Sequence, residues 1–265
     1  MGTTLGKSFG FLVGALVLGT AFPHLLKDIT VEFPWQTVVI ATSVIASAGG
    51  LLILIGVPNG PHRKPNKSPD FKVFFKVFEN KTFRSAAFGY FGHMWELYAF
   101  WTFVPIMIAT YAQLFPDSNF NIPLLSFIII GLGSLACVIG GFVSQTYGTK
   151  KTAAFALTMS CLCCLLSPLF FHIGSSTIFI GFLIFWGLVV IADSPLFSTL
   201  VAQSAIAENK GTALTIVNCI GFAITIISIQ LINNLIEVVD NKFIYSILAI
   251  GPILGLIGLK RSKVN

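Results

Sequence analysis

Two acidic residues stand inside long apolar stretches of this sequence, and each could bind a solute or transfer a proton. Glu96 lies with His93 in an apolar run over residues 87–111, and Asp193 lies beside Ser194 in a run over residues 177–200. A charged side chain at the centre of a bilayer costs about 3 kcal/mol on insertion scales, so it usually faces a protein interior or a water-filled cavity. Both acids are therefore candidate functional residues.

Helical spacing leaves three interpretations of Glu96. His93 and Glu96 are three residues apart on one helix face, so they could satisfy each other and only hold helices together. Alternatively, both face a cavity that binds a solute or passes a proton, with Trp95 and Tyr98 at its flank. The third interpretation places Glu96 at the membrane interface. The aromatic side chains suit sugars, drugs and aromatic acids equally, so no substrate is singled out.

Asp193 precedes a proline that must disturb its helix. Pro195 has no amide hydrogen, so the carbonyl four residues earlier needs another partner, for which Ser194, Ser198 or water are candidates. A break beside a buried acid is typical of a binding site. In the alternative interpretation, the polar side chains only repair the kink, or Asp193 lies near the inner membrane interface.

Membrane-spanning helices must position these residues. The 265-residue chain is 55% hydrophobic and only 10% charged, with a mean hydropathy of +0.88, whereas about a quarter of the residues in soluble domains are charged. We therefore expect an all-α, polytopic transmembrane bundle. Apolar runs long enough to span a bilayer fall at about eight places: 8–26, 35–57, 87–111, 123–145, 152–171, 177–200, 212–235 and 243–259.

The remaining residue types argue against metal or enzyme chemistry. No histidine or second cysteine pair stands at zinc-like spacing from the cysteines, so we predict packing roles, no disulfide, no metal and no cofactor. One intramembrane histidine and two distant acids do not supply the nucleophile, acid and base of an active site, which makes a membrane-embedded enzyme the least supported function. The cysteines are Cys137, Cys161, Cys163, Cys164 and Cys219.

The basic residues predict the orientation of the chain. Counted over alternate loops, fourteen of the sixteen Lys and Arg residues fall on one side, and only Lys27 and Lys242 fall on the other. Cytoplasmic loops carry the excess of basic residues, so we expect a multi-pass protein of the cell (inner) membrane with both termini in the cytoplasm. The net charge of +6 is then a topology signal, and nucleic acid is not an expected partner.

One polar segment divides the chain. Residues 58–86 are Pro-rich and basic at their start, which predicts a cytoplasmic central loop. Residues 1–57 precede it with two spans, and residues 87–265 follow it with six. The first ten residues lack the shape of a signal peptide, so we expect the first span to be retained. Gly10 and Gly14 are spaced as in GxxxG contacts, which favours close packing of this span.

The segment GFVSQTYGTKK, residues 141–151, resembles the G-x-x-x-D-R-x-G-R-R/K loop of the major facilitator superfamily. Four positions match that cytoplasmic gate loop, and Gln145 and Thr146 stand where its acid and first basic residue are expected. The segment that begins ENKGTALT resembles the start of the eleventh helix in that family. The four positions that match the gate loop are Gly141, Gly148, Lys150 and Lys151.

The resemblance covers essentially the whole chain and implies helices 5–12 of a bacterial-type member. It implies that Glu96 lies on the seventh helix and Asp193 on the tenth, the first helices of two inverted repeats that line a central cavity. The implied function is alternating-access transport of a small polar solute across the bilayer, with a proton on Glu96 or Asp193 as the candidate symported ion.

The same resemblance implies a truncated transporter that lacks four helices. We therefore expect no saturable transport from this chain alone, since alternating access rocks two bundles against each other. The alternative function is a non-transporting membrane subunit or pseudo-transporter.

Overall fold

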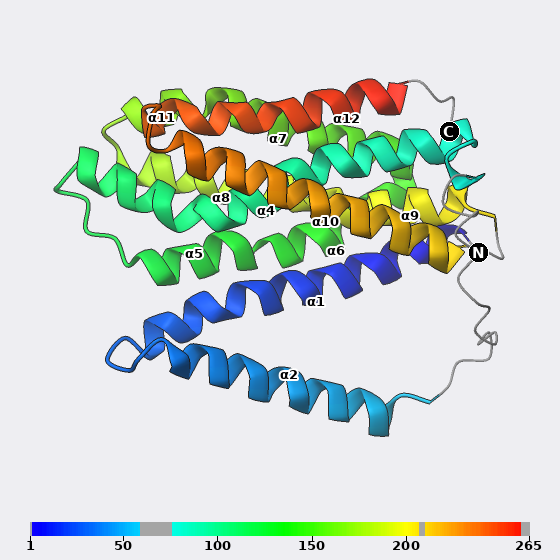
Figure 1. Ribbon diagram of the computed structural model, residues 1–265, viewed down its shortest axis with the longest axis horizontal. Helices are drawn as coiled ribbons and strands as arrows, with labels where there is room; N and C mark the ends of the chain where they lie inside the picture. Colours follow the sequence, from blue (N-terminus) through cyan, green and yellow to red (C-terminus); the bar gives the residue numbers. More distant parts are fainter. Residues whose placement is uncertain (1, 59–75, 207–209, 261–265) are drawn as a thin grey trace.

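The computed structural model describes residues 2–58, 76–206 and 210–260, and every regular element within these ranges is a helix. The helices run side by side along the long axis of the molecule (Figure 1). The elements are α1 (Gly2–Ile29), α2 (Gln36–Gly56), α4 (Lys81–Leu114), α5 (Ile122–Gly131), α6 (Gly133–Tyr147), α7 (Thr149–His172), α8 (Ser176–Ala192), α9 (Ser194–Ser204), α10 (Lys210–Leu235), α11 (Asn241–Ile244), the 3₁₀ helix η2 (Tyr245–Ala249) and α12 (Ile250–Lys260).

Eight helical segments of the described chain are long and apolar enough to cross a membrane. They coincide one for one with the eight apolar runs, which confirms the predicted all-α bundle. Three of these spans are built from more than one element: α5 with α6, α8 with α9, and α11 through η2 to α12. Single residues or a 3₁₀ segment therefore interrupt the α-helix within spans that look continuous in a hydropathy profile.

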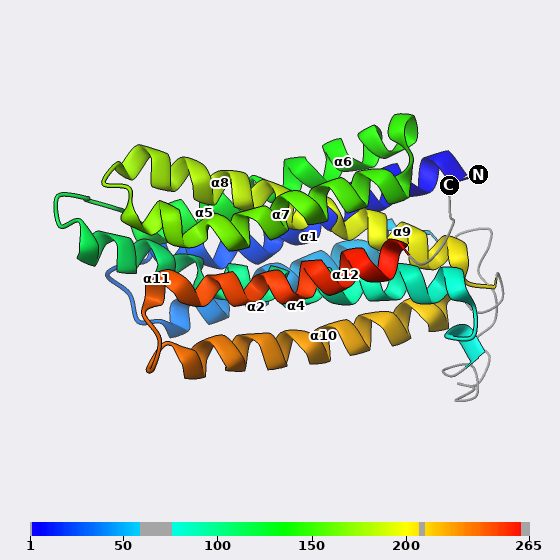
Figure 2. The same ribbon diagram turned by 90° about the horizontal axis from the view of Figure 1, so that it is seen from above.

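The long helix α4 forms the centre of the bundle. It packs chiefly against α12, α10 and α9, and half of its most apolar window is buried inside the protein. Seen from above, α10 lies at one side of the bundle and α8, α5 and α6 lie at the other (Figure 2). Any polar side chain on the inner faces of α4 is thereby removed from both lipid and water.

The first helix packs closely on α5 and α6. A Cβ atom added at Gly10 would lie 2.9 Å from the carbonyl oxygen of Cys137, and one added at Gly14 would lie 2.9 Å from that of Ser134. These distances leave no room for any side chain but hydrogen, so the predicted close packing of this glycine pair is confirmed. The second helix, α2, buries none of its residues in the described structure.

The central loop is shorter than residues 58–86. Helix α4 already begins at Lys81, because the Asn80 side chain accepts hydrogen bonds from the backbone N–H groups of Thr82 and Phe83 and so caps the helix. Residues 59–75, the centre of the predicted loop, lie outside the described ranges.

The described chain turns at alternate ends of the bundle. The starts of α1, α7 and α10 and the ends of α6, α9 and α12 lie at one end (Figures 1 and 2). The start of α7, which carries Lys151, lies at that end, whereas the end of α1, which carries Lys27, and α11, which carries Lys242, lie at the opposite one. These three lysines lie at the ends to which the loop count assigns them.

Candidate functional site

The Glu96 side chain lies inside the bundle, where α4 meets α7 and α8, and it is fully buried. Its Oε1 atom accepts hydrogen bonds from Trp186 Nε1 at 2.7 Å and from Cys164 Sγ at 3.2 Å. Its Oε2 atom lies 2.9 Å from the hydroxyl of Ser160. Three donors from two other helices thus satisfy both carboxyl oxygens.

The donors are themselves held in place. The Trp186 ring packs against Phe100 of α4, with ring centroids 4.7 Å apart. Pro168 removes the amide that would bond to the carbonyl of Cys164, and the Ser167 hydroxyl donates to this carbonyl instead, at 2.8 Å. The Cys164 backbone therefore keeps a partner although α7 contains a proline one turn later.

His93 contacts the second acid. Its Nδ1 atom lies 2.8 Å from Oδ1 of Asp193, and both side chains are fully buried. This arrangement differs from the interpretation in which His93 and Glu96 satisfy each other within one helix. On a helix of 3.6 residues per turn, a separation of three residues leaves an angular offset of about 60°, so Glu96 turns towards α7 while His93 turns towards the start of α9.

The pair of His93 and Asp193 is incompletely satisfied. The close contact has the distance of an ion pair but lacks the alignment of a hydrogen bond, and among the described side chains His93 Nε2 and Asp193 Oδ2 have no hydrogen-bond partner. Buried polar atoms normally have partners, and exceptions concentrate at functional sites. This pair is therefore less tightly constrained than Glu96.

Asp193 is positioned by the break between α8 and α9. Pro195 stands in the first turn of α9, and the carbonyl that it frees belongs to Ile191. That carbonyl accepts from the thiol of Cys137 on α6, at 3.5 Å, and not from Ser194 or Ser198 as the sequence suggested. Gly140 allows the approach, because a Cβ there would lie 2.8 Å from the carbonyl oxygen of Ala192.

Two cysteines therefore do more than pack. Cys137 and Cys164 are buried as expected, yet each donates to a polar group of the site. No spacing in the sequence indicated this, since the acceptors lie 54 and 68 residues away along the chain. Ser160 and Trp186 were missed for the same reason. Cys219, in contrast, is exposed on α10.

The helix face of Glu96 is a packing face. Gly92 meets α12 so closely that a Cβ would lie 2.3 Å from the carbonyl oxygen of Gly251, and Gly89 packs against Phe197. The small residues on this face therefore let neighbouring helices approach α4 closely. Trp95 and Tyr98 lie half-buried on another side of α4, where Tyr98 packs against Phe222 of α10 with centroids 5.4 Å apart.

The predicted gate-loop residues lie at the end of the bundle where α1 begins and α12 ends. Gly148 alone joins α6 to α7, with a φ of 89° that strongly favours glycine. Gly141 packs against Gly6 of α1, since a Cβ would lie 2.8 Å from the Gly6 carbonyl oxygen. Lys150 is half-buried and Lys151 is exposed. Ser194, the first residue of α9, is half-buried beside Asp193.

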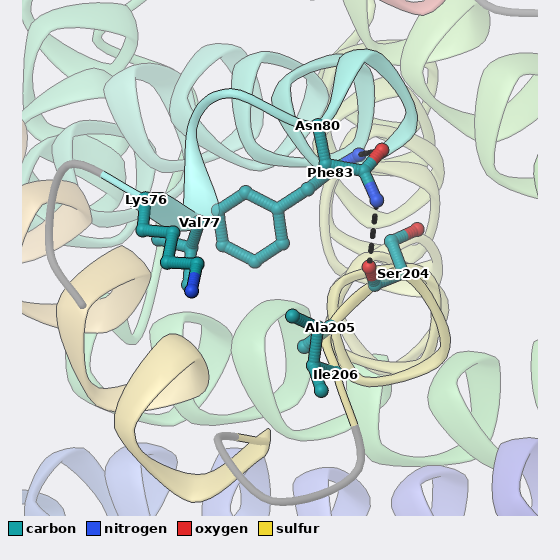
Figure 3. Close-up of a pocket in the computed structure, with 7 residues that line it drawn as sticks. All are labelled: Lys76, Val77, Asn80, Phe83, Ser204, Ala205 and Ile206. Carbon is teal, nitrogen blue, oxygen red and sulfur yellow. Dashed lines mark hydrogen bonds between the residues drawn. The ribbon is translucent and has the colours of Figure 1, made fainter.

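A small pocket opens near the start of α4, away from the two acids (Figure 3). The Asn80 amide donates to the carbonyl of Ser204 at 3.4 Å, which joins the start of α4 to the end of α9. Glu96 lies about 20 Å further along α4 at 1.5 Å per residue, so this pocket does not belong to the acid site. Its lining residues are Lys76, Val77, Asn80, Phe83, Ser204, Ala205 and Ile206.

The described residues contain no group of three or more His, Cys, Asp or Glu side chains that could hold a metal ion. A family model described as Major Facilitator Superfamily matches residues 1–229 of the chain. A comparison with curated proteins gave no match.

Proposed function

This chain belongs to the major facilitator superfamily, and from that premise we propose that it moves a small polar solute by alternating access with a proton as the coupled ion. One observation carries the coupling: α4 and the broken span of α8 and α9 each contribute a fully buried acid to their mutual contact. Buried acids of this kind mark proton pathways in transporters.

The two acids can link proton binding to helix movement. Glu96 connects α4 to α7 and α8 through its three donors, and His93 connects α4 to α9 through Asp193. Binding a proton removes one negative charge from the contact, which changes the free energy of separating the helices. His93 and Glu96 are one turn apart on α4, so a proton bound at one site changes the field at the other.

The other predicted residues take supporting roles in this proposal. Ser194 begins α9 beside the break, whereas Trp95 and Tyr98 lie where they could contact a solute but not the acids. Lys150 and Lys151, with Gly148 as the turn between helices, serve a gate at the basic end. We place that end and both termini in the cytoplasm of a cell whose inner membrane holds the protein.

Proton flux driven by solute tests the proposal. Because we expect no saturable transport from the 265-residue chain alone, a version completed with the four helices that the family resemblance implies would be reconstituted into liposomes that contain a pH-sensitive dye. Neutral sugars, aromatic acids and cationic drugs would be added outside in turn. We expect one class to acidify the lumen, with little acidification in Glu96→Gln and a partial loss in Asp193→Asn. Acidification at the wild-type rate in both variants would refute the assignment of the acids.

A non-transporting subunit or pseudo-transporter is the alternative, and α2 supports it, because a span with no buried residue is suited to packing against further membrane helices. In that case no solute class would acidify the lumen, while the protein would still fold with the same helix content. Whether the wild type shows proton flux is sufficient to decide between the two functions.

A further inference from the structure

We propose that Ser160 is a two-way hydrogen-bond partner that allows Glu96 to bind a proton on Oε2 without leaving a polar atom unpaired. The proposed function supplies a role for this proton, while the hydrogen bonds themselves do not depend on transport. Glu96 and Ser160 are both fully buried, so neither can replace a lost partner with bulk water.

The two carboxyl oxygens of Glu96 are not equivalent. Oε1 faces the indole N–H of Trp186, which can only donate, and the thiol of Cys164. A hydrogen on Oε1 would point at a donor and lose the 2.7 Å bond. Oε2 contacts only the hydroxyl of Ser160 among the described side chains. A proton is therefore accommodated on Oε2.

The Ser160 hydroxyl has a suitable partner in each state. Its Oγ lies 2.9 Å from Glu96 Oε2 and 3.2 Å from the backbone carbonyl oxygen of Leu157. When Glu96 is ionised, the hydroxyl donates to Oε2. When Glu96 is protonated, Oε2–H donates to Oγ, and the hydroxyl hydrogen rotates to the Leu157 carbonyl.

This exchange requires rotation of one hydrogen and no backbone movement. A hydroxyl has one donor and two acceptor lone pairs, so Ser160 can accept from Oε2 while it donates to Leu157. A side chain without this capacity would leave the acid hydrogen unpaired, which costs about 1–3 kcal/mol in a buried site. The protonation step adds one proton from the aqueous phase, the carboxylate becomes a neutral acid, and no other group changes charge.

The surrounding titratable groups are compatible with protonation at this atom. Asp193 is the second acid near Glu96, and its contact with His93 offsets its charge when the imidazole is protonated. The thiols carry no charge in their neutral form. The titratable groups near Glu96 are His93 one turn away on α4, Asp193 between α8 and α9, and Cys161, Cys163 and Cys164 on α7.

Infrared difference spectra between low and high pH, recorded on the protein in lipid, test the inference without any solute. We expect a C=O stretch of a protonated carboxylic acid that is absent in Glu96→Gln. Ser160→Ala removes the acceptor of the acid hydrogen, so the band should shift to higher frequency and its pH midpoint should move. Ser160→Thr keeps a hydroxyl that can serve both partners, and should preserve the band and the midpoint.

Ser167→Ala is the matched control, because the Ser167 hydroxyl donates to the Cys164 carbonyl on the same helix and does not contact Glu96. We expect it to leave the band in place. An unchanged band in Ser160→Ala, or no Glu96 band at any pH at which the protein is folded, would overturn the inference. A normal Ser160 response without proton flux for any solute would refute the proposed function and leave this inference intact.

Discussion

At the scale of single residues, the two buried acids differ in how completely their partners satisfy them. Glu96 has donors on both oxygens, whereas the pair of His93 and Asp193 leaves His93 Nε2 and Asp193 Oδ2 without partners among the described side chains. A buried ion pair contributes little net stability, but the removal of one partner strands the other charge. The His93–Asp193 contact should therefore show strong coupling in stability measurements.

A double-mutant cycle measures this coupling. We expect His93→Ala to lower stability by roughly 3–5 kcal/mol, because it leaves the buried carboxyl group of Asp193 without its partner. The double variant His93→Ala with Asp193→Ala should lose less than the sum of the two single losses, since neither side chain is then buried without its partner. Thermal midpoints in detergent provide the measurement, and strictly additive losses would contradict the pairing.

The acids could be identified from sequence, but their partners could not. A charge inside an apolar run is costly wherever the helix lies, so Glu96 and Asp193 stand out in the sequence alone. Which side chain faces them depends on the rotation of α4 against its neighbours. The intrahelical His93–Glu96 pair was one of three interpretations of the sequence, and the structure instead brings His93 to Asp193, while Ser160 and Trp186 carried no local signal.

At the scale of elements, the broken spans place polar groups where a continuous helix would have none. The break at Pro195 was predictable, because proline removes a hydrogen bond regardless of context. The break at Leu132 between α5 and α6 was not, since this position has no proline; Gly131 and Gly133 on either side were the available signal. Span positions followed from apolar length alone.

The contribution of the Cys137 thiol at the α8–α9 break can be tested by removing the thiol in the presence and in the absence of Pro195. Cys137→Ala should cost about 1 kcal/mol, because the Ile191 carbonyl then loses its thiol donor and keeps only the backbone N–H of Asp193. In a Pro195→Ala background the restored amide can bond to that carbonyl, so the same substitution should cost clearly less. Thermal midpoints of the four proteins give the coupling.

Cys163→Ala is the control for this cycle. Cys163 is buried on α7 away from the break, so its removal should lower the midpoint equally in both backgrounds. An equal loss for Cys137→Ala with and without Pro195 would show that the thiol only fills space.

The glycines of α1 provide a second element-scale prediction. Gly10→Ala would place a methyl group against the backbone of α6, and we expect a loss of about 1–3 kcal/mol from overpacking. Gly19 lies on the same helix with no atom within 4 Å of an added Cβ, so Gly19→Ala should be neutral or slightly stabilising. Equal effects of the two substitutions on the thermal midpoint would argue against the close α1–α6 contact.

At the scale of the whole molecule, the loop count assigns most basic residues to one end of the bundle, and this asymmetry predicts which end faces the cytoplasm. Lys151 is exposed after the α6–α7 turn, and Asp117 is exposed at the opposite end after α4. In a background in which Cys219 is serine, cysteine at 151 should react with an impermeant reagent only from inside, and cysteine at 117 only from outside. Labelling of both from one side would contradict the eight-span topology.

In the proposed mechanism a proton on Glu96 couples solute movement to the proton gradient, and one comparison decides whether it does. For a solute that drives proton flux, accumulation against a gradient and counterflow exchange would be measured in parallel for the wild type and Glu96→Gln. The variant keeps the shape of the side chain and much of its hydrogen bonding but cannot be ionised. We predict that Glu96→Gln loses accumulation while counterflow partly survives, and wild-type accumulation in this variant would contradict the coupling.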